Sequence, residues 1–161
     1  MKAISIEKTA DYAAVAAIHD ALYSYNLAKT GRERVEVRAE RFAEQFALVA
    51  VDGEGCAHGG LAYHWENAPR HVFVDYFYLD DTLRGTGCGR RIFEEMLAQA
   101  EAGGAVEVRL TTNTFQAPGF YLKMGFAVTG EKAEPAPLCP DNIHYTLRLK
   151  LNGRLRGGSD S

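Results

Sequence analysis

The chain of 161 residues is 47% apolar and 24% charged, and its formal net charge is −3. This is the size and composition of one globular domain with a buried core. The small negative charge gives no electrostatic reason to expect a nucleic acid or an anionic membrane as a partner. No apolar run approaches the roughly 18 residues of a membrane-spanning helix.

The ends of the chain and the cysteines bear on where the protein works. Residues 1–8 lack the apolar core of a secretion signal. The three cysteines form no CxxC pair and are typical of reduced thiols, which favours a cytoplasmic protein. We expect one domain over residues 1–151 and a flexible tail over residues 152–161, because the tail has too few apolar side chains to order itself.

The first part of the chain predicts a strand followed by two helices. Ala3–Ile6 is a short apolar segment typical of an edge strand. Thr9 is a suitable N-cap, because apolar residues then recur at helical spacing as far as Leu22. Tyr23–Gly31 is aromatic and polar and predicts a loop, whereas Arg32–Phe46 predicts a second helix with its apolar residues on one side.

Three strands are predicted next. Phe46–Val51, Gly59–Trp65 and His71–Leu79 are rich in apolar, aromatic and β-branched residues. Asp52–Gly55 is a hairpin signal between the first two.

The rest of the chain predicts two helices and three strands. An amphipathic helix runs to Ala100 and stops at Gly103-Gly104. In Val106–Leu110 the apolar residues alternate with Glu107 and Arg109, as in a strand with one buried face. The other expected elements are a short helix and two strands, Phe115–Met124, Phe126–Val128 and Ile143–Leu151.

The order β-αα-βββ-α-β-α-ββ predicts an α/β fold of three layers, in which helices flank a mixed, mostly antiparallel sheet. The strand–helix–strand unit from His71 to Leu110 is expected to be a right-handed parallel crossover.

A glycine-rich segment, Arg84–Arg90, joins the strand ending at Leu79 to the amphipathic helix. Backbone N–H groups at the start of a helix are unpaired and carry partial positive charge, so such a segment can bind phosphate. A nucleotide-binding P-loop is excluded because two arginines follow Gly89, and a dinucleotide fingerprint is excluded because Arg90 stands where its third glycine belongs. A phosphate loop of another kind and a plain tight turn are the remaining interpretations.

Two segments together resemble the signatures of the GNAT superfamily of N-acetyltransferases. Arg84–Gly89 is similar to the family's R/Q-x-x-G-x-G/A pyrophosphate loop. Ala117–Phe126 resembles the second signature, A-x-x-(L/F)-Y-x-K-x-G-F, which follows it along the chain. The predicted order of elements is also similar to the family fold over nearly the whole chain.

The resemblance implies that acetyl-CoA is the acyl donor. The strands before and after the central helix would separate, and the pantetheine arm would lie between them beside the backbone of Phe77 and Leu79. A backbone amide in the same region would face the thioester oxygen. The acetyl-CoA site implied by the motifs consists of Phe77, Leu79, Arg84, Gly85, Thr86, Gly87, Cys88, Gly89, Arg90, Phe120, Lys123 and a residue of the pair Asn113 and Thr114.

The resemblance also implies catalytic roles. Tyr121 would direct its hydroxyl at the CoA sulfur and protonate the departing thiolate; the alternative is a tyrosine that only packs a helix against the sheet. Asp75 is the leading candidate for the base that deprotonates the amine, because it is an acid within an apolar, aromatic strand. An acid that is only salt-bridged or lies at a bulge is the alternative, and Glu66 and His64 are weaker candidates for the base.

The acceptor is expected to be an amine, either a small molecule or a peptide, and Tyr23, Tyr25, Asn26 and Tyr76 are candidates for its site. No metal is expected, because the histidines lack metal-ligand spacing. A homodimer is compatible with a chain of this size. The predicted function is direct acetyl transfer from acetyl-CoA to a primary amine in a ternary complex. The alternative is a non-catalytic CoA-binding regulatory module on the same fold.

Overall fold

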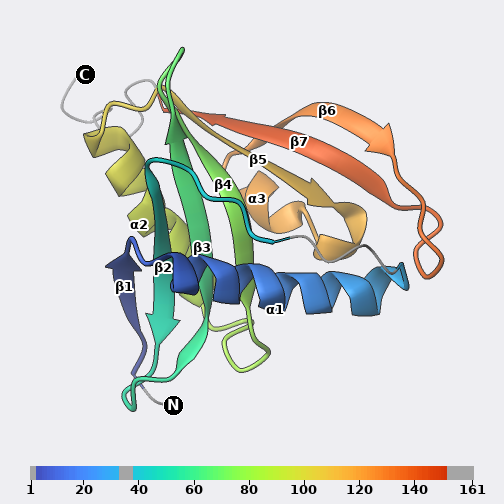
Figure 1. Cartoon of the computed structure of the whole chain (residues 1–161). Coiled ribbons are helices and arrows are strands. Elements are labelled where there is room, and N and C mark those ends of the chain that lie inside the picture. The colour runs from blue at the N-terminus through green and yellow to red at the C-terminus, as the bar shows by residue number, and fades with distance from the viewer. Residues whose placement is uncertain (1–2, 33–37, 152–161) are drawn as a thin grey trace.

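A computed structural model of the chain describes residues 3–32 and 38–151. Seven strands form one sheet in the order β1-β2-β3-β4-β5-β7-β6 (Figure 1). Every neighbouring pair is antiparallel except β4 and β5, which are parallel. The strands are β1 (Ser5–Thr9), β2 (Gln45–Val51), β3 (Ala57–Glu66), β4 (His71–Leu79), β5 (Glu107–Asn113), β6 (Ala127–Ala133) and β7 (Ile143–Lys150).

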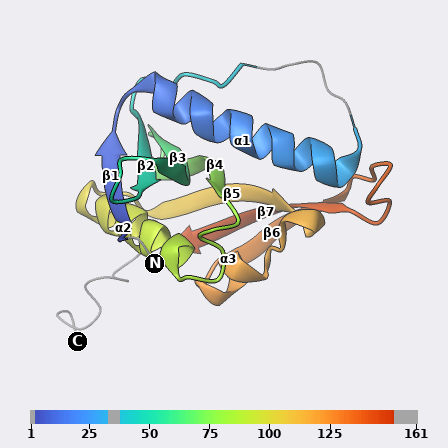
Figure 2. The ribbon, with the colours of Figure 1, turned by 90° about the horizontal axis from the view of Figure 1, so that it is seen from below.

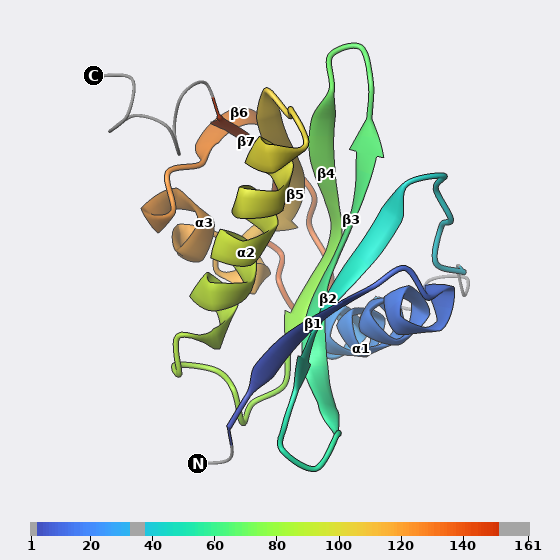
Figure 3. The same ribbon diagram turned by 90° about the vertical axis from the view of Figure 1, so that its left-hand side faces the viewer.

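Helices cover both faces of the sheet, which confirms the predicted fold class. Helix α1 (Tyr12–Thr30) lies across one face, and α2 (Cys88–Ala102) and α3 (Gly119–Lys123) lie on the other (Figures 2 and 3). The larger core cluster lies between α2 and the sheet, and a smaller one lies under α1. Among the described residues, no helix combines the length and the apolarity needed to cross a membrane.

The expected loop over Tyr23–Gly31 is wrong, because α1 continues through it to Thr30. The helix ends at Gly31, which has a φ of 66° and whose amide donates to the carbonyl of Leu27. This left-handed cap is the usual end of a long helix. The N-cap is Asp11 rather than Thr9, since the Asp11 carboxylate accepts the amide of Ala13.

The second predicted helix, over Arg32–Phe46, is also wrong in its described part. Residues 38–44 are not helical, Gln45 and Phe46 belong to β2, and residues 33–37 lie outside the described residues. The apolar side chains that suggested a helix have other partners: Phe42 stacks on the ring of His64 at a centroid distance of 3.6 Å. The predicted tail over residues 152–161 also lies outside the described residues.

Two further expectations differ in detail. Val106 precedes β5 and is 40% exposed, whereas Glu107 is only 7% exposed. Arg109 and Arg148 form ion pairs with the Glu107 carboxylate and stabilise it there, because a buried carboxylate needs cationic partners. The predicted helix over Phe115–Met124 is divided into a 3₁₀ turn and the short α3, because Ala117 adopts a left-handed φ of 54°.

Candidate active site

The sheet opens between β4 and β5. The two strands pair only at Val72–Val108 and Phe73–Arg109, and beyond these residues they separate as expected. A cavity of about 650 Å³ lies there. Its walls come from α1, the carboxyl half of β4, the loop into α2, the end of β5 and the segment around α3. The lining residues include Leu22, Tyr25, Val74, Asp75, Tyr76, Phe77, Tyr78, Leu79, Arg84, Gly85, Gly87, Gly89, Arg90, Leu110, Thr112, Gln116, Phe120 and Tyr121.

A bulge in β4 accompanies this opening. Tyr76 pairs with Ala62 and Val74 pairs with Tyr63, so Asp75 is an extra residue without a partner on β3. A bulge bends its strand and redirects a side chain. From Val74 to Leu79 the edge of β4 that faces β5 has no strand partner among the described residues, and its amides and carbonyls are available to an extended ligand.

The loop into α2 has the conformation of an anion site. Gly85 and Gly87 have φ values of 74° and 84°, and no other group lies within 4 Å of where a β-carbon would be. Within the described part of the chain, no acceptor is recorded for the amides of Gly87, Gly89 and Arg90, which face outward at the helix start. Three open amides at a helix N-terminus, with an arginine among them, suit a phosphate group.

Arg84 lies at the entrance of this loop. Its Nε donates to the carbonyl of Leu79 at 3.3 Å, and its guanidinium lies 5.0 Å from the ring centroid of Tyr25. Asp81 pairs with it at 3.0 Å on the solvent side. Arg84 is therefore fixed between the mouth of the cavity and α1.

Five residues named for the expected acetyl-CoA site do not line the cavity: Thr86, Cys88, Asn113, Thr114 and Lys123. Cys88 is 3% exposed in the core, where burial raises the pKa of its thiol. Thr86 accepts the amide of Cys88 with its hydroxyl and so organises the turn. Lys123 is exposed at the end of α3. Gly89 lines the cavity, but its α-carbon also packs on Phe77 and Phe120.

Tyr121 lies in an aromatic cluster at the wall of the cavity. Its ring contacts those of Phe77, Phe93, Phe120 and Phe126 at centroid distances of 5.4 to 6.5 Å. Burial raises its pKa, so the phenol keeps its proton at neutral pH. Its hydroxyl has no hydrogen-bond partner among the described residues. The Tyr121 hydroxyl can therefore donate its proton to a bound ligand without breaking a hydrogen bond within the described residues.

Asp75, His64 and Glu66 form one hydrogen-bonded chain. The Asp75 carboxylate lies 2.8 Å from Nδ1 of His64, and Nε2 of His64 lies 2.6 Å from Glu66. Burial raises the pKa of Asp75, although His64 and Gln45 partly offset this effect. Burial alone would lower the pKa of His64, but the two carboxylates raise it overall. Of the three candidate bases, Asp75 lines the cavity, and His64 lies behind it.

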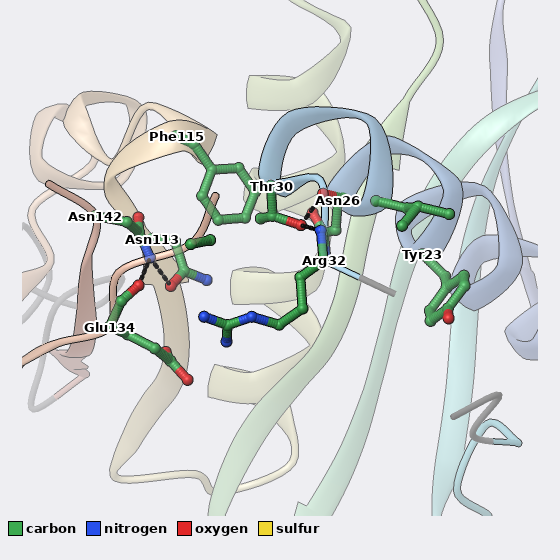
Figure 4. Close-up of a pocket in the computed structure, with 10 residues that line it drawn as sticks. Tyr23, Asn26, Thr30, Arg32, Asn113, Phe115, Glu134 and Asn142 are labelled. Atoms are coloured by element: carbon green, nitrogen blue, oxygen red, sulfur yellow. Dashed lines mark hydrogen bonds between the residues drawn. The ribbon is translucent and has the colours of Figure 1, made fainter. Parts of the chain in front are cut away.

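The other candidate residues divide between two pockets. Tyr25 and Tyr76 line the large cavity, together with Tyr78. Tyr23 and Asn26 line a smaller pocket of about 110 Å³ near the end of α1 (Figure 4). Asn113 lines the smaller pocket too, and Thr114 bonds to the backbone of Ile143 instead, so neither lies on the large cavity.

Several residues at these pockets were not predicted from the sequence. Gln116 lines the large cavity, and its amide joins Asn113 to Asn26 across the two pockets. Arg32 and Asn142 line the smaller pocket. Gln116 directly precedes the second signature, which was a usable signal; Arg32 and Asn142 lie in segments without a motif.

A second histidine cluster, also not predicted, supports the loop into α2. His58 lies 2.7 Å from Asp52, at the β2–β3 turn, and 2.8 Å from Asp80, at the start of the loop. The Asp80 carboxylate in turn accepts the amide and the hydroxyl of Thr82. His58 therefore connects the hairpin to the loop that carries the open amides.

Comparison with known proteins shows which family has this sequence and fold. Residues 13–126 match the model of the acetyltransferase (GNAT) family. A blasticidin-S acetyltransferase of Streptomyces morookaense is 32% identical over 120 residues, which cover 73% of this chain and 82% of that protein. The peptidyl-lysine N-acetyltransferase YjaB of Escherichia coli strain K12 is 37% identical over 81 residues, which cover 45% of this chain and 49% of that protein. The crystal structure of a GCN5-related N-acetyltransferase from Kribbella flavida has the same fold, with a TM-score of 0.71 at 17% identity over 92% of this chain and 98% of that one.

Proposed function

Since the chain belongs to the acetyltransferase (GNAT) family, we propose that it transfers an acetyl group from acetyl-CoA directly to a primary amine in a ternary complex. The observation that carries the proposal is that one cavity connects the open amides at the start of α2 with both Asp75 and Tyr121. A donor with a diphosphate and a thioester needs these features at the two ends of one site.

The described residues fit acetyl-CoA. The amides of Gly87, Gly89 and Arg90, with the guanidinium of Arg84, would hold the diphosphate. The unpaired edge of β4 would bond the pantetheine amides as an added strand would, and an amide of that edge would stabilise negative charge on the thioester oxygen.

Two side chains would move the protons. A lysine-like amine is neutral in only about one molecule in 2,500 at pH 7, so a base is needed. The Asp75 carboxylate would accept the ammonium proton, because the pKa of Asp75 is raised and its side chain is held by His64. The amine nitrogen then bonds to the acetyl carbon, the carbon–sulfur bond breaks, and the Tyr121 hydroxyl would donate its proton to the leaving sulfur. The second proton that the nitrogen loses would return to the Tyr121 oxygen, which leaves an amide and the CoA thiol.

The relatives suggest which acceptors to examine first. The blasticidin-S acetyltransferase matches this chain over most of both lengths, which favours a small-molecule amine. The match to the peptidyl-lysine N-acetyltransferase covers less than half of either chain, so a peptide amine is the second candidate. The cysteines Cys56, Cys88 and Cys139 are free thiols, which supports a cytoplasmic location.

Thiol release from acetyl-CoA tests the proposal. The assay would use blasticidin S, a panel of amino acids and polyamines, and lysine peptides, each with and without the protein. We expect amine-dependent release for at least one acceptor. Calorimetric binding of CoA without release for any amine would instead identify a non-catalytic CoA-binding module, and absence of binding would refute both interpretations.

A further inference from the structure

The smaller pocket and the large cavity are lined by different residues of the same two elements, α1 and β5. On α1, Leu22 and Tyr25 line the large cavity, whereas Asn26 lines the small pocket. On β5, Thr112 faces the large cavity and the next residue, Asn113, faces the small pocket. The pockets are therefore neighbours, and the Gln116 amide, which bonds to Asn26 and Asn113, lies between them.

The loop between β6 and β7 closes the small pocket against α1. The amide of Leu138 donates to the carbonyl of Thr30 at 3.0 Å, and the side chain of Leu138 packs on Gly31, where an added β-carbon would lie 2.8 Å from it. The guanidinium of Arg32 also bonds to the carbonyl of Pro135. Contacts along both sides leave a bounded pocket of about 110 Å³, which suits a group of a few atoms.

Arg32 brings to this pocket a positive charge that has no ion-pair partner among the described residues. Its guanidinium extends into the space between Asn113 and Glu134 (Figure 4). Its partner among the described residues is the neutral carbonyl of Pro135, and it forms no ion pair with them. A guanidinium has five N–H donors in a planar fork that matches a carboxylate, so most of its donors stay available.

The neighbouring amides of Asn26 and Asn113 add donors, whereas the side-chain oxygen of Asn142 is a buried acceptor without a partner among the described residues. The side-chain oxygen of Asn26 is occupied by the amide of Gln116, which leaves the Asn26 NH₂ group without a partner among the described residues. The oxygen of Asn113 accepts from both Asn142 and His144, and its NH₂ group donates one bond to Oε1 of Gln116, which leaves its second hydrogen without a partner among the described residues. Asn142 donates both its bonds as well, to Asn113 and to the carbonyl of Glu134.

Glu134 is the one acid at the pocket among the described lining residues. Its carboxylate lies 3.5 Å from Nδ1 of His144, which gives it a partner other than Arg32. A pocket that offers the remaining donors of the Arg32 guanidinium, the NH₂ group of Asn26 and one hydrogen of the Asn113 NH₂ group favours an anionic group with several acceptor sites. A planar carboxylate fits the guanidinium and the available volume.

We propose that this pocket binds the carboxylate of the acceptor, so that the substrate is a small amine that also carries a carboxylate. Arg32 is then the residue that selects the substrate, with Asn26 and Asn113 as further donors, and the amine extends past Gln116 toward Asp75. The inference rests on the proposed acetyl transfer. It adds a chemical class of acceptor that neither the fold nor the catalytic residues specify.

Pairs of amines that differ only in the carboxylate test the proposal. Thiol release from acetyl-CoA is measured with L-lysine and cadaverine, with L-ornithine and putrescine, and with β-alanine and ethylamine. We expect a KM at least about tenfold lower for the carboxylate member of a pair that is turned over, which is the effect of one charge-assisted hydrogen bond. Equal KM values within every such pair would overturn the proposal.

Variants of Arg32 separate recognition from catalysis. Arg32→Gln is expected to raise KM for the carboxylate member about tenfold or more, with kcat, the KM of the partner amine and acetyl-CoA affinity unchanged. Arg32→Lys keeps the charge and should restore part of the effect. Arg41→Gln removes an exposed arginine that lies over Tyr12, outside the pocket, and is the matched control. An equal rise for both members of a pair contradicts a role in carboxylate recognition.

Failure of the acetyl transfer itself is distinguishable. If no amine releases thiol, saturation-transfer NMR on the CoA-bound protein still compares L-lysine with cadaverine. Binding of L-lysine that is lost in Arg32→Gln supports the carboxylate pocket and places the fault with the proposed reaction. Equal signals from the two amines, or no signal from either, overturn the pocket assignment.

Discussion

Tyr121 is surrounded by four phenylalanine rings, and this setting determines what its hydroxyl can do. The four rings pack against the phenol at the wall of the cavity, so the oxygen is not needed to hold the side chain in place. Because burial raises the pKa of Tyr121, the hydroxyl is a donor and not an acceptor of protons at neutral pH. A hydroxyl of this kind acts on a leaving group as negative charge develops on it.

Tyr121→Phe is therefore expected to lower kcat by about 10²–10⁴-fold and to leave KM for acetyl-CoA nearly unchanged. Thermal unfolding should change little, because no hydrogen bond within the described residues is lost. Tyr145→Phe, at a half-buried tyrosine of the same core, is the control. Steady-state kinetics on the identified acceptor measure whether the hydroxyl acts in catalysis. Wild-type turnover in Tyr121→Phe would show that Tyr121 only packs in the core.

Asp75 combines a raised pKa with a bulge that turns it into the cavity. A base works only when it is ionised, so activity should fall as the pH drops through this raised pKa. Asp75→Asn should lower the rate and remove this acidic limb, while the acetyl-CoA dissociation constant stays the same. Asp20→Asn is the matched control, since Asp20 also contacts a histidine but is exposed. A pH–rate profile with an unchanged acidic limb would exclude Asp75 as the base.

At the scale of an element, the loop into α2 owes its shape to glycines with positive φ. Asp tolerates the left-handed region better than most residues, and it is a favoured N-cap. Gly87→Asp therefore keeps the helix but puts a negative charge where the diphosphate would lie. Calorimetry should show acetyl-CoA binding weakened by about tenfold or more, with a loss of thermal stability no larger than in Gly104→Asp, where φ is also positive.

Gly104→Asp is the control for this change. Gly104 has a φ of 85°, close to the 84° of Gly87, and equally open surroundings, but it lies past the opposite end of α2. Equal loss of binding in the two variants would remove the anion site from the loop. Gly89 is less suitable for the test, because a β-carbon there would lie 3.3 Å from Phe77 and would disturb the core as well.

The contact between the β2–β3 hairpin and the same loop depends on the charge of His58. Both ring nitrogens face carboxylates, and donating to both requires the imidazolium. The bonds to Asp52 and Asp80 raise the pKa of His58 above 6.5, and the bond to His58 lowers the pKa of Asp52 to about 2. The stabilisation by His58 is thus complete below pH 6.5 and is lost as the pH rises through its folded-state pKa.

We expect the free energy of unfolding of the wild-type protein to decrease with this step above pH 6.5, and His58→Gln to lack it. Denaturant unfolding across a pH series measures the difference. His19→Gln, at a histidine with one carboxylate neighbour, should keep the step. A step that persists in His58→Gln would mean that another group titrates there.

At the scale of the whole molecule, β2, β3 and α1 approach one another closely at a glycine. Gly60 on β3 lies where a β-carbon would be 2.3 Å from the carbonyl oxygen of Leu48 and 3.1 Å from Ile18 on α1. Neither β2 nor α1 can move away without losing packing. Gly60→Ala should therefore reduce the free energy of unfolding by about 1–3 kcal/mol, whereas Gly53→Ala, in an open turn, should have little effect. Equal stability of the two variants would show that α1 adjusts freely.

The sequence by itself determined the elements whose patterns are local. The apolar, aromatic and β-branched composition of β3 and β4 predicted strands, and the amphipathic pattern of α2 with the glycines around it predicted the helix and the loop before it, within a few residues. It predicted the candidate site as far as the two signatures reach, which includes Tyr121 and the loop. These features depend on hydrogen bonds and periodicities between near neighbours, so each segment carries its own signal.

Tertiary structure decided what depends on distant partners. Residues 23–30 are helical because α1 packs across the sheet, with Tyr25 near Tyr78, although their composition is that of a loop. The Asp75–His64–Glu66 chain, the His58 contact and the Arg32 pocket each join side chains from separate segments. Such groups acquire their partners and their charges only when the sheet assembles, because no local pattern specifies which polar residues will meet.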